Sequence, residues 1–235
     1  MSKNESKIIE LRAMLDRRIA QAQELALELE RAPIEEVPFW VVDIETTGGD
    51  AEQDRIIELA AIKVQEGEMQ RVISTLINPQ RPIPVFIQRL TGITNQMLCS
   101  SPPAEEVFPW LFSHLKNGVF VAHLANFDRS FIDQEALRLG LKPLFLPNLC
   151  TLRLSRRIIF GLPGYSLDHI ARHFGLEFGS AGPRGRHRAL GDAWVCARAF
   201  LSMLALAKKY GINSFGELKH LESMPIRKAR DLCKG

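Results

Sequence analysis

Features that define several other protein classes are missing from this 235-residue chain. Its four cysteines are widely separated and form no CxxC pair, which argues against a structural zinc site. No apolar run approaches the roughly 20 residues needed to span a bilayer. The N-terminal residues lead into a segment of mixed charge and contain no apolar signal region. We therefore expect a cytoplasmic protein that does not bind a membrane.

An excess of one charge is also nearly absent, since 30 basic and 27 acidic residues give a net charge of +3. Such a balance is weak evidence for a nucleic-acid partner. Hydrophobic residues make up 46% of the chain, and its length is sufficient for one good-sized domain with extensions. The positions of the charged residues are therefore more informative than their number.

The N-terminal segment, from about Lys7 to Arg31, predicts one helix. Apolar residues recur along it every seven positions, at Ile8, Leu15, Ala22 and Leu29. Three heptads are short for a coiled coil, so we expect this helix to lie against the main domain. The alternative is a helix that binds a partner or a second copy. A linker containing Pro33 follows, and residues 1–36 form the first predicted unit.

Residues 37–211 show the pattern of an α/β domain. Three strands joined by short turns are expected at Phe39–Glu45, Ile56–Val64 and Val72–Ile77, which favours antiparallel pairing. Helices and short strands then alternate, at Ala104–Lys116, Val119–His123, Phe127–Leu139, Leu149–Leu152, Ser166–Phe174 and Ala189–Tyr210. This order predicts a mixed β-sheet flanked by helices. Residues 212–235 are interpreted as a basic C-terminal tail.

Two carboxylates stand at the end of the first apolar strand. Asp43 and Glu45 are two residues apart, so their side chains point to the same face of the sheet. Neighbouring carboxylates beside an apolar strand are costly to ionise unless a cation lies between them. Oxygen ligands of this kind suit Mg²⁺ or Mn²⁺, although a solvated strand end would show the same pattern.

Two later acidic residues favour the metal site. Asp128 is expected in the first turn of a helix that follows a strand. Asp192 is expected inside the long C-terminal helix, with His187 in the loop just before it. On one continuous helix, residues five apart would be about 140° out of phase. With His187 in the loop, both side chains can face one cleft.

In this order and at these distances, Asp43-x-Glu45, Asp128 and His187-x₄-Asp192 resemble the three motifs of the DnaQ-like exonucleases, in their DEDDh branch. Further similarity lies at Glu58-Leu59-Ala60-Ala61, Leu90-Thr91-Gly92-Ile93-Thr94 and Tyr165-Ser166-Leu167. The resemblance covers about Phe39 to Leu206 and implies a ribonuclease-H-like α/β fold. The chain departs from the family pattern at Leu124, where asparagine is common, and this concerns the support of the Asp128 carboxylate.

The resemblance implies a metal-dependent 3′–5′ exonuclease with two Mg²⁺ or Mn²⁺ ions about 4 Å apart. The implied metal ligands are Asp43, Glu45, Asp128 and Asp192. His187 would be the general base, because imidazole titrates near neutral pH. The implied cradle for the terminal nucleotide consists of Thr46, Thr47, Gly48, Thr91, Gly92 and Ile93. Phe127 would offer a stacking surface that tolerates any base.

Three substrate and partner hypotheses remain open. The first is a nuclease for DNA 3′ ends, mainly single-stranded, in replication proofreading or repair. The second is an RNA-trimming enzyme of the same branch, since only contacts to the ribose would separate the two. The third is a subunit that docks to a polymerase or repair complex through the N-terminal helix or the tail.

Two arginine clusters suit phosphate contacts, at Arg153, Arg156 and Arg157 and at Arg184, Arg186 and Arg188.

Overall fold

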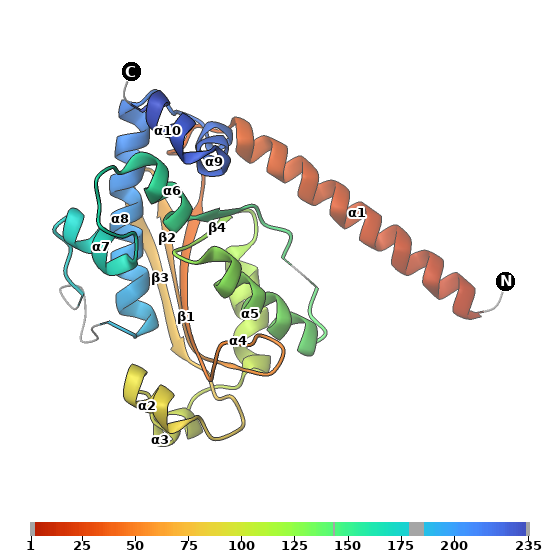
Figure 1. Ribbon diagram of the computed structural model, residues 1–235. Coiled ribbons are helices and arrows are strands. Elements are labelled where there is room, and N and C mark those ends of the chain that lie inside the picture. The colour runs from red at the N-terminus through yellow and green to blue at the C-terminus, as the bar shows by residue number, and fades with distance from the viewer. Residues whose placement is uncertain (1–2, 143, 179–185, 234–235) are drawn as a thin grey trace.

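The computed structural model describes residues 3–142, 144–178 and 186–233 (Figure 1). Its centre is a five-stranded sheet with the strand order β3-β2-β1-β4-β5. The strands are β1 (Phe39–Thr46), β2 (Ile56–Gln65), β3 (Glu68–Leu76), β4 (Val119–Ala122) and β5 (Asn148–Cys150). β1, β2 and β3 pair antiparallel, whereas β4 and β5 run parallel to β1. The predicted mixed sheet is therefore confirmed.

Helices cover both faces of this sheet (Figure 1). They are α1 (Lys3–Arg31), α2 (Val85–Thr91), α3 (Asn95–Cys99), α4 (Ala104–Leu115), α5 (Ala125–Arg138), α6 (Thr151–Ile158), α7 (Leu167–His173), α8 (Ala189–Lys209), α9 (Phe215–Ser223) and α10 (Ile226–Leu232). Strand β5 ends at Cys150 and not at the predicted Leu152, and the helix α6 that follows it was not predicted. Thr151 begins that helix, and its buried hydroxyl bonds to the backbone oxygen of Ala122 at the end of β4.

Side chains along β1 alternate between two apolar cores. Trp40 and Val42 belong to the core beneath α4 and α5. Val41 belongs to the other core, which α6, α7 and α8 cover. Because side chains two apart share a face, Asp43 and Glu45 continue the row of Val41 toward α8. The register of this one strand therefore decides which helix can meet the two carboxylates.

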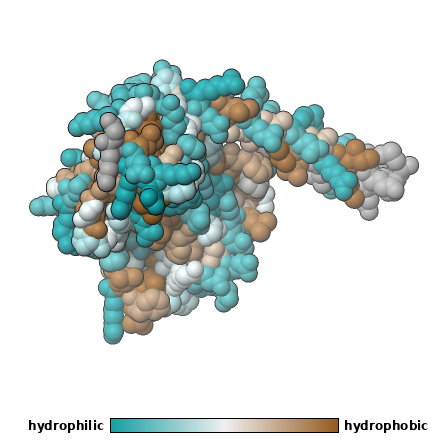
Figure 2. All heavy atoms as spheres, turned by 45° about the horizontal axis from the view of Figure 1, so that its top comes forward, coloured by the Kyte–Doolittle hydropathy of each residue, from teal (hydrophilic) through white to brown (hydrophobic). Residues whose placement is uncertain are grey.

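Helix α1 projects from the domain (Figure 1). Only its C-terminal part joins the core, where Leu29 is 7% exposed and Leu25 is half-buried. Farther out, Ile8 and Leu15 are 53% and 48% exposed, and brown apolar side chains stand on the projecting helix in Figure 2. The prediction that the helix lies against the main domain is wrong for this outer half. Its apolar residues, which recur every seven positions, continue beyond the domain surface that could cover them.

The predicted C-terminal tail is also corrected, because residues 212–233 are part of the folded domain. The ring of Phe215 on α9 is 1% exposed and packs edge-on against Phe39, with ring centroids 6.0 Å apart. Ser214 and Glu217 form a capping box that begins α9. Glu222 at the end of α9 is buried and accepts a hydrogen bond from the Cys150 backbone N–H. These apolar and polar contacts fix α9 to the first residue of β1 and the last residue of β5.

Helix α8 is long and apolar enough to cross a membrane by length and composition. In the structure, 61% of its apolar window is buried inside the protein. Such burial is the environment of a core helix, which is apolar on most sides for the same reason. The apolar character of α8 is therefore explained by its burial in the core on one face of the sheet.

Candidate metal centre and active site

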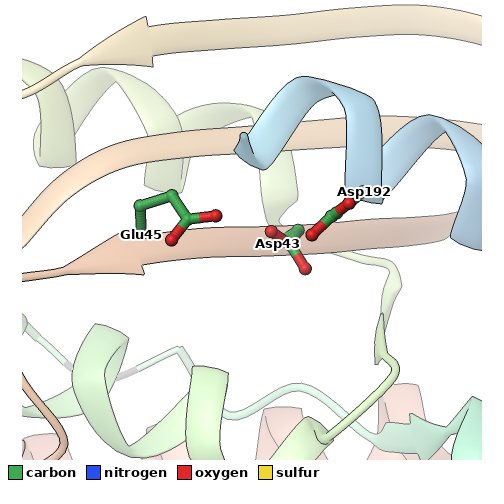
Figure 3. A group of neighbouring side chains, drawn as sticks. All are labelled: Asp43, Glu45 and Asp192. Carbon is green, nitrogen blue, oxygen red and sulfur yellow. The ribbon is translucent and has the colours of Figure 1, made fainter. Parts of the chain in front are cut away.

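Three carboxylates meet between β1 and α8 (Figure 3). Asp43 and Glu45 come from β1, and Asp192 comes from the first turn of α8. One ligand atom from each residue lies within 4.8 Å of the others. This set is called the acidic cluster below. Oδ1 of Asp192 is buried and has no hydrogen-bond partner in the described part of the chain.

The electrostatics of the acidic cluster fit a divalent cation. Burial raises the pKa of Asp43 well above its usual range, and the charges of Asp128 and Asp192 raise it further. Burial likewise raises the pKa of Glu45 to about 8 and that of Asp192 to about 6. A cation would relieve this repulsion and give Asp192 Oδ1 a partner. The all-oxygen donor set suits a hard ion such as Mg²⁺ or Mn²⁺.

Asp128 approaches the site from α5 and is not a member of the acidic cluster. Burial raises its pKa to about 7, whereas hydrogen bonds from its own backbone N–H and that of Ile44 lower it. Leu124, which precedes α5, is 55% exposed and provides no side-chain cap. Backbone groups of β1 and α5 thus support the Asp128 carboxylate. It keeps these hydrogen bonds although Leu124 stands where the family commonly has asparagine.

A pocket of about 270 Å³ opens over these acids. It is lined by Asp43, Ile44, Glu45, His123, Leu124, Phe127, Asp128, Leu167, Arg186, His187 and Asp192. All five residues predicted to be catalytic therefore line one cavity. His123 is held within the fold, since its two ring nitrogens lie 3.1 Å from Thr151 Oγ1 and 3.0 Å from the Tyr165 backbone oxygen.

His187 lies in the turn immediately before α8. Its φ of 62° is in the left-handed region, which few residues other than glycine and asparagine adopt. The His187 backbone N–H donates to the Asp192 carboxylate. Burial lowers the pKa of His187, and the charge of Arg186 lowers it further. A neutral imidazole near pH 7 can accept a proton, which suits a general base.

Arg186 is the pocket residue whose role the sequence analysis missed. Its Nη1 donates to Asp192 Oδ2, and its Nε lies 3.3 Å from Asp168 Oδ1. The guanidinium also lies over the Phe178 ring, 5.4 Å from the centroid. The sequence placed Arg186 only within a general basic cluster. No local sequence pattern pairs Arg186 with Asp168, which lies 18 residues earlier on α7.

The other predicted phosphate-binding arginines differ in their surroundings. Arg184 lies outside the described residues. Arg153 pairs with Glu222 at 3.5 Å, and Arg157 Nε donates to the Met224 backbone oxygen at 2.6 Å. Both of these arginines therefore attach α6 to the segment containing α9 and α10. These contacts give Arg153 and Arg157 a structural role, and the phosphate contacts predicted for their cluster stay a prediction.

The first half of the predicted nucleotide cradle follows β1. Thr46 and Thr47 are 8% and 3% exposed, and Thr47 Oγ1 donates to Asp54 Oδ1 at 2.9 Å. A Cβ atom added at Gly48 would lie 2.3 Å from Asp54 Oδ2, so this turn has no space for a larger residue. These residues do not line the described pocket, and the tight turn exposes little more than backbone.

The second half of the cradle lies at the end of α2. Gly92 caps that helix with a φ of 70°, and the Thr91 hydroxyl accepts a hydrogen bond from the Ile93 backbone N–H. Ile93 is 0% exposed as a whole residue and packs in a small core, so neither its side chain nor its backbone offers surface to a ligand. Phe127, in contrast, is 38% exposed and lines the pocket, while Phe131 beside it is buried.

Comparison with known proteins shows the family to which this chain belongs. The exonuclease family model (RNase_T) matches residues 40–200. The DNA polymerase III subunit epsilon of Aquifex aeolicus is 41% identical over 185 residues, which cover 78% of this chain and 89% of that protein. The 3′–5′ exonuclease DinG of Bacillus subtilis is 34% identical over 184 residues, but these span only 19% of its length.

Solved structures show the same fold. Exonuclease X in complex with 5′ overhanging duplex DNA aligns with a TM-score of 0.57 and 24% identity. That alignment covers 83% of this chain and 99% of the other. Together with the matched family model and the epsilon relative, it confirms the resemblance inferred from the motifs. The chain belongs to the RNase T family of exonucleases, which includes the DnaQ-like proofreading subunits.

Proposed function

We propose that this chain is a metal-dependent 3′–5′ exonuclease that releases nucleotides from DNA 3′ ends in proofreading or repair. The observation that carries the proposal is the acidic cluster, whose buried Asp192 Oδ1 has no partner among the described residues. The epsilon relative, a subunit of a DNA polymerase, and the relative named a 3′–5′ exonuclease support both the polarity and the DNA substrate.

Each residue of the pocket has a distinct proposed role. Asp43, Glu45, Asp128 and Asp192 would hold the divalent ions, the first, second and fourth of them as the acidic cluster. When bound, Mg²⁺ or Mn²⁺ ions supply activation of the attacking water and stabilisation of the departing 3′ oxygen. His187 would accept a proton from the attacking water at its imidazole ring. The exposed ring of Phe127 stacks on a base at the substrate end.

The choice between DNA and RNA can be tested on matched 5′-labelled single strands. In the presence of Mg²⁺ or Mn²⁺, we expect a ladder that shortens from the 3′ end and forms faster on DNA. EDTA and the Asp43→Ala variant should both abolish it. Faster shortening of RNA would favour the RNA-trimming alternative, and no cleavage of either strand would contradict an autonomous exonuclease.

We propose in addition that α1 docks the nuclease to a DNA polymerase or repair complex. The outer half of the helix exposes Ile8, Leu15 and Ile19, while its attached end buries Leu29 in the core. Most of the stability of a helix in a protein comes from packing its apolar face and not from intrinsic helix propensity. A partner that covers Ile8, Leu15 and Ile19 would provide this packing.

Removing residues 1–20 tests the docking proposal without disturbing Leu25 and Leu29. The shortened chain should degrade free single-stranded DNA at the rate of the full chain. The shortened chain should no longer associate with the replicative polymerase of the same organism. Sedimentation of the purified proteins measures this association. Leu15→Lys should reproduce this loss in the full-length chain. Association that survives both changes would contradict docking through α1.

A further inference from the structure

A fully buried acid outside the acidic cluster lies on the same face of the sheet. Glu58 on β2 is 0% exposed and pairs directly with Glu45 in the β1–β2 register. Two strand neighbours that share a face stand close together, so Glu58 faces α8 just as Glu45 does. A carboxylate buried this deeply requires hydrogen-bond donors around it.

Those donors come from the start of α8. The Arg188 guanidinium binds Glu58 with two parallel hydrogen bonds, Nε to Oε2 at 2.9 Å and Nη2 to Oε1 at 2.8 Å. The Ala189 backbone N–H donates to Oε2 at 3.0 Å. Arg188 is the N-cap residue of α8 and provides no side-chain cap itself. Glu58 therefore caps the helix from the neighbouring strand, at the end where the helix dipole favours an anion.

This two-point contact, called the Glu58–Arg188 clamp below, fixes more than the helix end. A bidentate arginine–carboxylate pair sets orientation as well as distance. His187 lies directly before the clamp and Asp192 lies less than one helical turn beyond Ala189. On the other side, β2 is hydrogen-bonded to β1, which carries Asp43 and Glu45. The clamp thus joins the strand pair to the helix beside the reacting groups.

We propose that Glu58 and Arg188 are positioning residues, which hold His187 and Asp192 in register with Asp43 and Glu45. This inference rests on the proposed exonuclease function. A purely stabilising role explains the clamp poorly, because desolvation offsets most of the attraction in a buried ion pair. Groups that orient metal ligands, in contrast, commonly change metal affinity or activity by about 10- to 100-fold when they are altered.

The test compares Glu58→Gln and Arg188→Lys with a matched control, Glu135→Gln. Glu135 is also a buried acid paired with an arginine, Arg138 at 2.8 Å, but it lies on α5 beneath the opposite face of the sheet. Mn²⁺ affinity is measured by electron paramagnetic resonance, and kcat and KM are measured on single-stranded DNA. Thermal melts report the folded fraction of each variant.

Both clamp variants should bind Mn²⁺ about tenfold more weakly and lose kcat by about the same factor or more, with little change in KM. Arg188→Lys keeps the charge but loses the fork, so its loss would identify geometry as the cause. The Glu58→Gln/Arg188→Lys double variant should lose no more than either single variant. Glu135→Gln should lower the melting temperature while Mn²⁺ affinity and kcat stay near those of the wild type.

The proposal is overturned if Glu58→Gln and Arg188→Lys keep wild-type Mn²⁺ affinity and kcat and are only destabilised, as the control is. Should Glu58→Gln fail to fold, Arg188→Lys decides the matter alone. The Mn²⁺ titration needs no nucleic acid. A wild-type chain that binds Mn²⁺ but leaves DNA intact would contradict the proposed function and still allow the clamp to be tested. A wild-type chain that binds no Mn²⁺ would contradict both.

Discussion

Arg186 donates a hydrogen bond to Asp192 and so shares a carboxylate with the acidic cluster. Its side chain is 33% exposed, and it also pairs with Asp168 on α7. The guanidinium of Arg186 lies on Oδ2 of Asp192, whereas a divalent cation would take the unpartnered Oδ1, so the two would compete for the charge of one carboxylate. Arg186 thus lies at the edge of the site and weakens the attraction of this carboxylate for a metal ion.

Replacing Arg186 by glutamine should therefore tighten Mn²⁺ binding. A partly exposed ion pair contributes up to about 1 kcal/mol, so we expect an increase of about two- to fivefold. Isothermal titration of the wild type, Arg186→Gln and the surface control Arg172→Gln would measure it. Weaker Mn²⁺ binding in Arg186→Gln would show that Arg186 assists the ion and does not compete with it.

The raised pKa values of the site acids predict an unusual pH dependence of stability. Because Glu45 and Asp128 have pKa values of about 8 and about 7, the folded protein keeps protons that the unfolded chain releases near pH 4. Stability without metal should therefore fall as the pH rises from about 4 to 8. Melting curves in EDTA would measure this fall, and Mn²⁺ should reverse it at pH 8. A melting temperature that rises between about pH 4 and 8 would contradict the raised pKa values of Glu45 and Asp128.

Loss of the His187 imidazole should slow turnover and leave metal binding intact. General bases contribute about 10²- to 10⁴-fold to rates, so kcat of His187→Ala should fall by a factor in this range. His187→Asn separates the base from the backbone, since asparagine tolerates the left-handed conformation at this position. The exposed His173 provides the control. A near-normal kcat in both His187 variants would exclude this residue as the base.

Gly48 and Gly49 offer a matched pair for testing the turn after β1. A Cβ atom at Gly48 would collide with Asp54, whereas one at Gly49 would meet no atom within 4 Å. Gly48→Ala should displace Asp54 from Thr47 and cost about 1–3 kcal/mol of stability, as overpacking does elsewhere. Denaturant unfolding of the two alanine variants would check this. Equal stability would show that the turn adjusts without strain.

Deleting residues 212–235 should prevent stable folding. Phe215, Leu218 and Leu221 are each at most 1% exposed and belong to the core on the α8 face. Losing several large core side chains costs about 2–5 kcal/mol each, comparable in sum with the stability of a whole domain. Circular dichroism of the truncated chain should show lost cooperativity. A sharp wild-type melt would restore the interpretation of this segment as a tail.

Much of the pocket could be predicted because its signals are local. The spacing of Asp43 and Glu45 on an apolar strand determines their shared face, and placing His187 before a helix and Asp192 within it follows from helical geometry. Arg186 could not be placed in this way, because its partner Asp168 lies on a separate helix. The contact between Phe215 and Phe39 joins distant parts of the chain, and sequence periodicity carries no information about such packing.

Helix α1 leaves the domain beside α9, near the residue that begins β1, whereas the acidic cluster lies toward the other end of that strand (Figure 1). A partner held on the outer half of α1 would therefore leave the pocket open. The helix would act as a rigid tether, whose length increases by about 1.5 Å for each residue. Such a tether raises the effective concentration of the nuclease around any 3′ end that the partner holds, so that the rate of cleavage there no longer depends on the amount of free enzyme.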